Sequence, residues 1–516
     1  MITELASSRT PLPTSFRFRD RSGATEISVP LTTTEQLYYR SDERSLRISD
    51  DLRTLQRPND ELDEVAIYSY LQFGAVVPPL SPWKSIRRFV PGTTTIVSNA
   101  STPSVRRSCP QKPPTQAIRS PNIEQQISMV VSALDRSLLE HCAGRPVTIL
   151  FSGGVDSGLL AARAAVLRLK NVTLVNYSFG PNDAESMLAE QMARHLGLKF
   201  VRIMEDTGGS DVADVLRHAG VYYRTLFGDH SVAPTCAMIR AAIPQCEAGG
   251  IVLEGTGADS GFGEFGRAMQ WQRVYALPAW SRKLGAMAYR TTRAWGGESK
   301  LEYYLRILRR AEQLKHPFAA VAENALLGIA YHPSKEDVDA IEEHLAGWLP
   351  HLSPPDPRLQ LAAFDLSLGC ASITAQKSRS LFDGTSLDVV YPYLLPDMVN
   401  VAFASVDWPG SGTEVKRVLK AALAQHVPST MVYRAKSGFV ASMPDKFGHR
   451  AFLTAFDKLL EPQAPLSRFL DRKFLLAIRS KLATKQKLPP QTEYFIWCAV
   501  FGNEWIEQVS RGNLNS

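Results

Sequence analysis

The sequence has 516 residues, a length that indicates roughly two to four domains. Its 44% hydrophobic and 21% charged content is that of an ordinary globular protein, with no run of about 18 apolar residues to span a membrane. The net charge of +7 is spread along the chain rather than gathered into a nucleic-acid interface. The N-terminus lacks the apolar segment of a secretory signal, and the six cysteines lack the spacing of a zinc cluster. We therefore expect a cytoplasmic protein with reduced thiols and with neither a nucleic-acid nor a membrane partner.

Residues 1–110 are predicted to be rich in β-strands. Residues 37–40 and 45–48 alternate in hydrophobicity as a short hairpin does, and residues 93–97 form a further strand. Between them, DELDEVAIYSYLQF at 60–73 has apolar residues at helical spacing and an acidic start. Residues 101–121 are rich in proline, serine and basic residues, which is typical of a linker, and we place the linker between domains at 111–121.

From residue 122 to 516 the pattern changes to helices alternating with short hydrophobic strands. This alternation predicts an α/β domain with a parallel sheet covered on both faces. The chain from about 270 to 510 is mainly helical. The predicted elements are a helix at 122–141, a strand at 147–151, a helix at 158–169, a strand at 172–179, a helix at 184–196, and strands at 199–203 and 251–254.

A glycine-rich loop follows the strand at 147–151 and reads S-G-G-V-D-S, residues 152–157. Backbone N–H groups between a strand and a helix bind phosphate, and Gly153 and Gly154 let the backbone approach the anion closely. The hydroxyls of Ser152 and Ser157 can donate further hydrogen bonds. No lysine is present, so the loop is not of the Walker type. Asp156 would repel phosphate unless it held Mg²⁺, a cation that prefers oxygen ligands.

A second acidic loop, E-G-T-G-A-D-S-G at 254–261, follows the strand at 251–254. Ligands of open α/β sheets bind at the carboxyl ends of the strands, so Asp156 and Asp259 are predicted to converge on one metal ion. Taken alone, either loop is also compatible with a tight turn and a helix cap.

Several segments resemble the asparagine synthetase branch of the ATP pyrophosphatases, over roughly residues 35–440. The loop S-G-G-V-D-S is similar to the pyrophosphate loop of that group. The other similar segments, in the order of the family, are YLQFGAVVPPLSPWKSIRRFVPGTTTIV at 70–97, GTGADSGFG at 255–263, SLDVVYPYLL at 386–395, EVKRVLK at 414–420 and YRAKSGF at 433–439.

The resemblance implies a β-rich, degenerate glutaminase-like domain (Ntn-type) at 1–110 and an adenine-nucleotide α-hydrolase-like ligase domain at 122–516. The implied chemistry is attack of a carboxylate on the α-phosphate of ATP, followed by attack of an amine on the acyl-adenylate. The implied cofactors are ATP and Mg²⁺, with Asp156 and Asp259 as metal ligands and Lys436 stabilising the developing charge. The residues implied to bind the nucleotide are Leu150, Ser152, Gly153, Gly154, Asp156, Ser157, Phe179 and Gly255.

The chain departs from this family at several positions. Where the family's glutaminases have a nucleophilic cysteine after Met1, this sequence has Ile2, and no cysteine precedes Cys109. Without that thiol a covalent acyl-enzyme cannot form, so we expect no glutaminase activity. Thr256 replaces the family's Glu or Tyr and has no useful pKa as a base. Glu254 or Asp388 is expected to substitute, unless the incoming amine needs no base. Val390 replaces the family's arginine, which argues against a free amino acid as the substrate.

These departures are similar to those of lasso-peptide cyclases, which adenylate an Asp or Glu side chain of a peptide and close a macrolactam ring with its N-terminal amine. We therefore favour an AMP-forming amide ligase that acts on a precursor peptide. A leader-binding protein or a leader protease is the partner that this resemblance implies. The alternatives are β-lactam synthesis, ammonia-dependent amidation of a small carboxylate, a sulfur-transfer ATP pyrophosphatase, and a nucleotide-fold protein without enzymatic activity.

Overall fold

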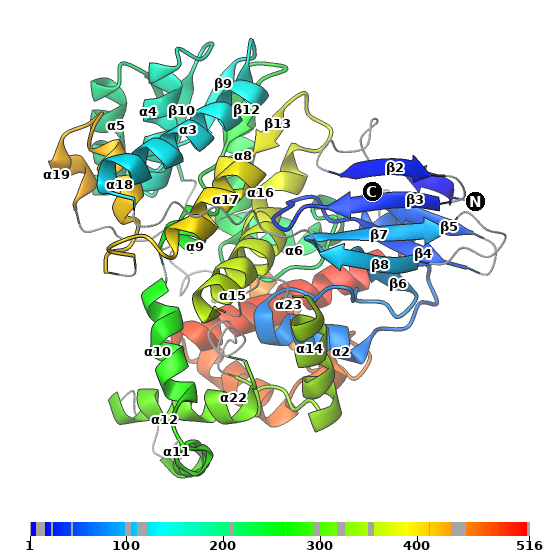
Figure 1. The fold of residues 1–516 in the computed structure, drawn as a ribbon. Coiled ribbons are helices and arrows are strands. Elements are labelled where there is room, and N and C mark those ends of the chain that lie inside the picture. Colours follow the sequence, from blue (N-terminus) through cyan, green and yellow to red (C-terminus); the bar gives the residue numbers. More distant parts are fainter. Residues whose placement is uncertain are drawn as a thin grey trace.

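A computed structural model describes most of the chain and contains three β-sheets with many helices around them (Figure 1). Every structural statement below refers to the described residues. These are 2–6, 16–21, 24–42, 45–98, 105–110, 121–205, 210–263, 265–292, 300–316, 326–348, 356–411, 413–434 and 450–512.

Two four-stranded sheets form the N-terminal part. One has the order β1-β5-β4-β6 and the other the order β2-β3-β7-β8. Alternating side chains of both sheets share one buried cluster, which includes Ile27, Ile48 and Val97. The strands are β1 (Ile2–Ala6), β2 (Arg17–Arg21), β3 (Ala24–Val29), β4 (Tyr38–Ser41), β5 (Leu46–Ser49), β6 (Ile86–Arg88), β7 (Thr93–Ser98) and β8 (Val105–Pro110).

The predicted hairpin is confirmed, because β4 and β5 pair antiparallel with Tyr39 opposite Ile48. The linker prediction for 101–121 is wrong over 105–110. These residues form β8, which pairs antiparallel with β7 in spite of its arginines and its terminal proline. An edge strand tolerates charged side chains and a terminal proline, which is why its composition is similar to that of a linker. Residues 111–120 lie outside the described part of the chain.

The third sheet is the predicted parallel sheet, with five strands in the order β11-β10-β9-β12-β13. The predicted strands of this region are confirmed, and the short edge strand β13 was not predicted. The strands are β9 (Val147–Leu150), β10 (Thr173–Ser178), β11 (Lys199–Met204), β12 (Ile251–Leu253) and β13 (Asp388–Val390).

Alternation along these strands builds one hydrophobic core on each face of the parallel sheet. Val147, Ile149 and Leu253 belong to the core under α3, α4, α5, α17 and α18, whereas Leu150 and Val252 belong to the core under α8 and η3. Both faces are therefore covered, as the hydrophobic strands predicted. The covering helices are α3 (Ile123–Cys142), α4 (Val155–Val166), α5 (Ala184–His195), α17 (Pro396–Ser405) and α18 (Arg417–Leu423) on one face, and α8 (Val232–Ala242) and η3 (Asp365–Thr374) on the other.

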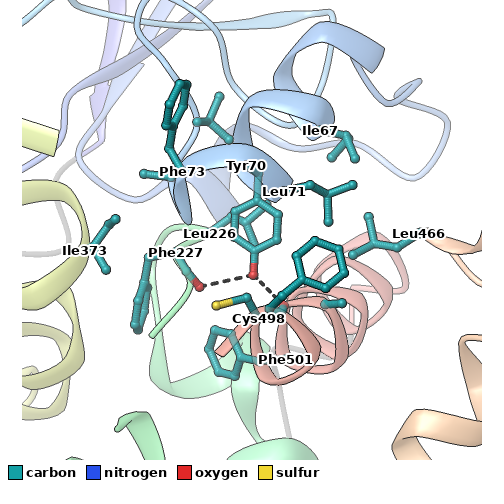
Figure 2. Packing of buried hydrophobic residues seen from close by; sticks show 14 of the residues in the cluster. Ile67, Tyr70, Leu71, Phe73, Leu226, Phe227, Ile373, Leu466, Cys498 and Phe501 are labelled. Atoms are coloured by element: carbon teal, nitrogen blue, oxygen red, sulfur yellow. Dashed lines mark hydrogen bonds between the residues drawn. The ribbon is translucent and has the colours of Figure 1, made fainter. Parts of the chain in front are cut away.

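The largest core joins the N-terminal part to the end of the chain. The predicted helix at 60–73 is observed as α2 (Glu64–Phe73), which begins after the capping carboxylate of Asp63. The Tyr70 hydroxyl on α2 donates a 2.7 Å hydrogen bond to the carbonyl of Cys498 on α23 (Pro490–Ser510) (Figure 2). A Cβ on Gly502 would lie 2.6 Å from the Tyr70 ring. The two helices therefore meet at a contact that leaves no room for a side chain.

The remaining helices complete the mainly helical second half of the chain. None of the described helices combines the length and the low polarity that crossing a membrane requires. The remaining helices are α1 (Leu52–Leu55), α6 (Ser210–Arg217), α7 (Ala219–Tyr222), η1 (Ile243–Gln245), α9 (Ala258–Phe262), α10 (Phe265–Tyr275), α11 (Ala279–Thr292), α12 (Lys300–Gln313), α14 (Lys335–Trp348), α15 (Pro357–Phe364), α16 (Gln376–Arg379), η4 (Ser380–Phe382), η5 (Pro392–Leu394), α19 (Ser429–Val432), α21 (Arg450–Lys458), η6 (Ser467–Phe469) and α22 (Arg472–Ala483).

Candidate active site

The glycine-rich loop lies between β9 and α4, at the carboxyl edge of the parallel sheet. Gly153 has a left-handed φ of +69°, and a Cβ there would lie 2.7 Å from the Cα of Ala189 on α5. Only glycine fits this position, because the conformation is strained for other residues and the space is closed. The Ser157 hydroxyl accepts a hydrogen bond from the Ser152 N–H at 3.2 Å and so fixes the turn.

Helix α4 begins at Val155 with Gly154 as its N-cap, three residues earlier than predicted. The first turn therefore includes Asp156 and Ser157, which the sequence placed in the loop. A carboxylate in the first turn is favourable because the helix dipole is positive there, which explains the earlier start. A glycine-rich loop that leads into the N-terminus of a helix is an arrangement that favours anions, because backbone N–H groups and the positive end of the helix dipole lie there.

Asp156 and Asp259 converge on one cation, which is not a metal ion, and their binding of Mg²⁺ stays a prediction. That cation is the side chain of Lys416, whose Nζ lies 2.6 Å from Asp156 Oδ2 and 2.7 Å from Asp259 Oδ1. We call these three residues the Asp–Lys–Asp cluster. Burial lowers the pKa of Lys416, but the charges of both aspartates and their hydrogen bonds outweigh burial and raise it. The ammonium group therefore stays protonated.

Lys416 is a candidate site residue that the sequence analysis missed. It lies in the segment EVKRVLK, immediately before α18, and its backbone is left-handed at φ +58°. The sequence did contain a signal for this residue. Two acidic loops at one edge of a sheet require a nearby cation, and EVKRVLK is one of the segments that resemble the asparagine synthetase branch. The predicted lysine, Lys436, lies outside the described residues.

A second group of polar side chains surrounds Glu254, directly after β12. Thr256 Oγ1 donates to Glu254 Oε1 at 2.7 Å, and Ser378 Oγ on α16 donates to Oε2 at 2.6 Å. The hydroxyls of Ser378 and Tyr391 lie 2.9 Å apart. We call these four residues the glutamate network. Burial raises the pKa of Glu254, and the hydrogen bonds from Ser378 and Thr256 offset only part of the effect.

The structure brings Gly255 to the Asp–Lys–Asp cluster and leaves Asp388 far from it. A Cβ on Gly255 would lie 3.1 Å from the Cβ of Asp156, so the two loops are in contact. Asp388 begins β13, at the amino edge of the sheet, where it pairs with Arg145 at 2.7 Å. Because both acidic loops leave the carboxyl edge, the prediction of Asp388 as a substitute base is corrected.

The two residues predicted for the adenine pocket lie near the ends of neighbouring strands. Leu150 ends β9, is only 9% exposed and belongs to the core under α8 and η3. Phe179 follows β10, and its ring packs edge-on against Tyr177 with 5.8 Å between the centroids. Phe179 is half-buried, so it is the more accessible of the two. Their contact with adenine stays a prediction.

The Asp–Lys–Asp cluster presents two carboxylates from different loops, which are oxygen ligands of the kind that Mg²⁺ prefers, and both pair with the Lys416 ammonium within 2.7 Å. Within the described ranges, no three or more His, Cys, Asp and Glu side chains gather in a metal-binding group. The donor set therefore consists of two protein carboxylates, which suits Mg²⁺, a cation that keeps several waters and binds substrate phosphates.

One of the comparisons with known proteins gave a match. The family model described as asparagine synthase matches residues 129–497, which include both acidic loops and Lys416. The comparison with curated proteins gave no match.

Proposed function

This chain belongs to the asparagine synthase family, and from that premise we propose that it closes a macrolactam ring on a precursor peptide. The family implies an ATP-dependent ligase that forms carbon–nitrogen bonds. What we add is the substrate: a side-chain carboxylate of a peptide and the N-terminal amine of the same peptide. The observation that carries the activation step is the Asp–Lys–Asp cluster beside the first turn of α4.

In the activation step, a carboxylate oxygen of the substrate attacks the α-phosphorus of ATP. The bond from that phosphorus to the oxygen bridging to the β-phosphate breaks, and pyrophosphate leaves. Negative charge grows on the phosphates, so the N–H groups of the glycine loop and the Lys416 ammonium stabilise the transition state. Asp156 and Asp259 would hold Mg²⁺, which supplies additional positive charge at the phosphates when bound.

In the amide-forming step, the amine attacks the acyl carbon, loses a proton, and AMP leaves. Glu254 is the base that we propose, because its half-buried side chain lies at the carboxyl end of β12 and burial raises its pKa above the usual value of a glutamate. Thr256 itself occupies the position that is acidic or phenolic elsewhere in the family. Its hydroxyl, which donates to Glu254, can pass a proton from the amine to the carboxylate.

The amine is proposed to come from the substrate itself rather than from glutamine. The first cysteine in the sequence is Cys109, in β8 of the second N-terminal sheet. An amine on the same molecule as the acyl group has a high effective concentration, which suits a site whose base acts through a threonine. A peptide substrate also makes a leader-binding protein or a leader protease the proposed partner.

The decisive experiment measures pyrophosphate release from ATP with Mg²⁺. Free aspartate plus ammonia, β-lactam precursors and a panel of peptides bearing Asp or Glu are compared, and Lys436→Ala is included as a variant of the predicted charge-stabilising lysine. Peptide-dependent release, with a product lighter by one water and no response to glutamine, is the expected result. Release with free aspartate or with a β-lactam precursor instead would assign the corresponding small-molecule amidation and overturn the peptide substrate.

A further inference from the structure

Helix α16 consists of four residues whose side chains contact two different parts of the molecule. Gln376 and Arg379 are three positions apart and so lie on one side of the helix, while Lys377 and Ser378 point elsewhere. All four make polar contacts with residues distant in the sequence. The helix therefore connects the contacts of Gln376 and Arg379 with the contacts of Lys377 and Ser378, which are adjacent to them in the sequence.

The inner contacts of α16 lead into the ligase site. Ser378 donates to Glu254 at 2.6 Å, and Lys377 Nζ lies 3.0 Å from Asp229 Oδ2 and 2.8 Å from Ser231 Oγ. Burial raises the pKa of Asp229, but the charges of Lys377 and His230 outweigh it and lower that pKa. Ser378 follows Lys377 directly, so the Lys377 contacts hold the backbone that carries the Ser378 hydroxyl, the donor to the Glu254 carboxylate.

The outer contacts of α16 lead to the loop before β4, in the N-terminal part of the chain. Arg379 Nη2 lies 2.5 Å from Glu35 Oε1, with side chains only 9% and 14% exposed. Gln376 Nε2 donates to the carbonyl of Thr34 at 2.7 Å. Just before this loop contact, Thr32 Oγ1 donates to the carbonyl of Leu394 at 2.6 Å. This loop therefore holds the helix through Gln376 and Arg379, and not through the two residues whose contacts lead into the site.

A second group of buried ion pairs joins the N-terminal part of the chain to the rest of the molecule. Arg224 Nη1 lies 2.9 Å from Asp50 Oδ2, and its Nε lies 2.5 Å from Asp383 Oδ2, beyond the end of η4. The side chain of Asp50 is 1% exposed. Removing one partner of a buried pair leaves an uncompensated charge and is strongly unfavourable, so these pairs keep the boundary in one arrangement.

We infer that Glu35 is a positioning residue of the amide-forming step, acting through Arg379 and α16 on Ser378 and Glu254. The N-terminal sheets then serve as the support that orients the base of the neighbouring ligase site. This inference rests on the proposed function, in which Glu254 accepts the proton of the amine. This supporting role differs from a glutaminase role, because it requires no contact between the N-terminal part and the substrate.

The test compares Glu35→Gln, which removes the charge, with Glu35→Asp, which keeps it. Asp42→Asn is the matched control, because Asp42 also pairs with an arginine, Arg57, but on the surface of the same part of the chain. Two reactions are followed against pH with an Asp- or Glu-bearing peptide: ATP–pyrophosphate exchange for activation, and formation of the dehydrated product for ring closure.

For Glu35→Gln we expect unchanged exchange, ring closure slowed about tenfold or more, and a displaced pH profile of ring closure, since small misplacements of a reacting group are costly. Glu35→Asp should lose less of the ring-closure rate than Glu35→Gln, and the control Asp42→Asn should keep the wild-type rate. Equal losses in both reactions together with a lower melting temperature would show a merely structural role and overturn the inference, as would no loss at all.

If no peptide supports exchange in the wild type, the proposed function fails and the positioning inference is tested separately. The melting temperatures of Glu35→Gln, Glu254→Gln and the double variant are then compared. A coupled network predicts a non-additive shift, whereas additive shifts would show that position 35 does not act on Glu254.

Discussion

At the scale of single residues, the site combines two acidic side chains with one lysine that no local pattern connects to them. Lys416 lies 260 positions beyond Asp156, yet its ammonium group joins the carboxylates of two loops. A cation held in this way is fixed before the substrate arrives, so stabilising new negative charge requires little rearrangement. We therefore propose that Lys416 contributes to activation by its position as much as by its charge.

Replacing Lys416 with methionine is expected to lower the rate of pyrophosphate release by about a hundredfold or more, because one preorganised positive group is lost. Lys420→Met is the control, since Lys420 lies one turn further along α18 and pairs with Glu414 at 2.7 Å. The rate of pyrophosphate release is measured for both variants and for the wild type. Equal effects of the two substitutions would mean that net charge, and not the Asp–Lys–Asp cluster, supports activation.

Replacing Glu254 with glutamine is expected to slow ring closure and remove its dependence on pH. Burial raises the pKa of Glu254, and a carboxylate base acts only when deprotonated, so the wild-type rate should rise with pH through that pKa. The pH–rate profile of ring closure measures this. A profile in Glu254→Gln that matches the wild type would contradict the assignment.

The same substitution has an opposite consequence for stability. A raised pKa in the folded state gives stability that is complete below the unfolded pKa of glutamate and is lost as pH rises through the folded pKa. Glu254→Gln removes this loss. The free energy of unfolding, measured with urea, should therefore rise in the variant relative to the wild type as the pH goes from acidic to neutral. A difference between the two proteins that does not change with pH would contradict the raised pKa of Glu254.

At the scale of elements, the glycine loop depends on how β9, α4 and α5 pack. Gly153→Ala is expected to destabilise the fold by more than the roughly 1–2 kcal/mol of a left-handed alanine, because its Cβ would also meet the backbone of Ala189. The change should also weaken ATP binding. Thermal unfolding and nucleotide titration are the measurements.

Gly144→Ala is the matched control for this substitution. Gly144 is also left-handed, at φ +74°, but nothing lies within 4 Å of its added Cβ, and it precedes β9 at the other edge of the sheet. The control should lose about the cost of the backbone conformation alone and keep its nucleotide affinity. Identical behaviour of both variants would show that the loop tolerates a side chain.

Sequence patterns predicted the parts of the fold that are encoded locally. The strands at 147–151 and 251–254 end in glycines and carboxylates, so both acidic loops and their common edge were predictable. β13 was missed because three residues carry too little pattern, and it joins the sheet only through pairing with the distant β12. The same limit applies to Lys416 and Ser378, whose roles depend on neighbours far away in the chain.

At the scale of the whole molecule, α2 and α23 share one core although they lie at opposite ends of the sequence. Tyr70 donates to the Cys498 carbonyl (Figure 2). The ring of Tyr70 also leaves no room for a side chain at position 502. The N-terminal sheets and the ligase part are further joined by buried ion pairs at Glu35 and Asp50. We therefore expect the described parts to unfold together.

Gly502→Ala is expected to cost about 1–3 kcal/mol of stability, the usual penalty for overpacking a core. The loss should appear equally in amide exchange of β7, in the N-terminal part, and of β9, in the parallel sheet. Gly180→Ala, with open space around the added Cβ and no left-handed φ, is the control. Lower protection confined to one of the two strands would show that the parts unfold independently.

The left-handed backbone of Lys416 has a consequence for protein engineering. Glycine relaxes such a conformation, so a design that considers backbone strain alone would select Lys416→Gly. That variant would remove the ammonium group between the two aspartates, and the lost ion pairs would cost more stability than the relaxed backbone returns. A stabilising library for this chain therefore needs position 416 held as lysine.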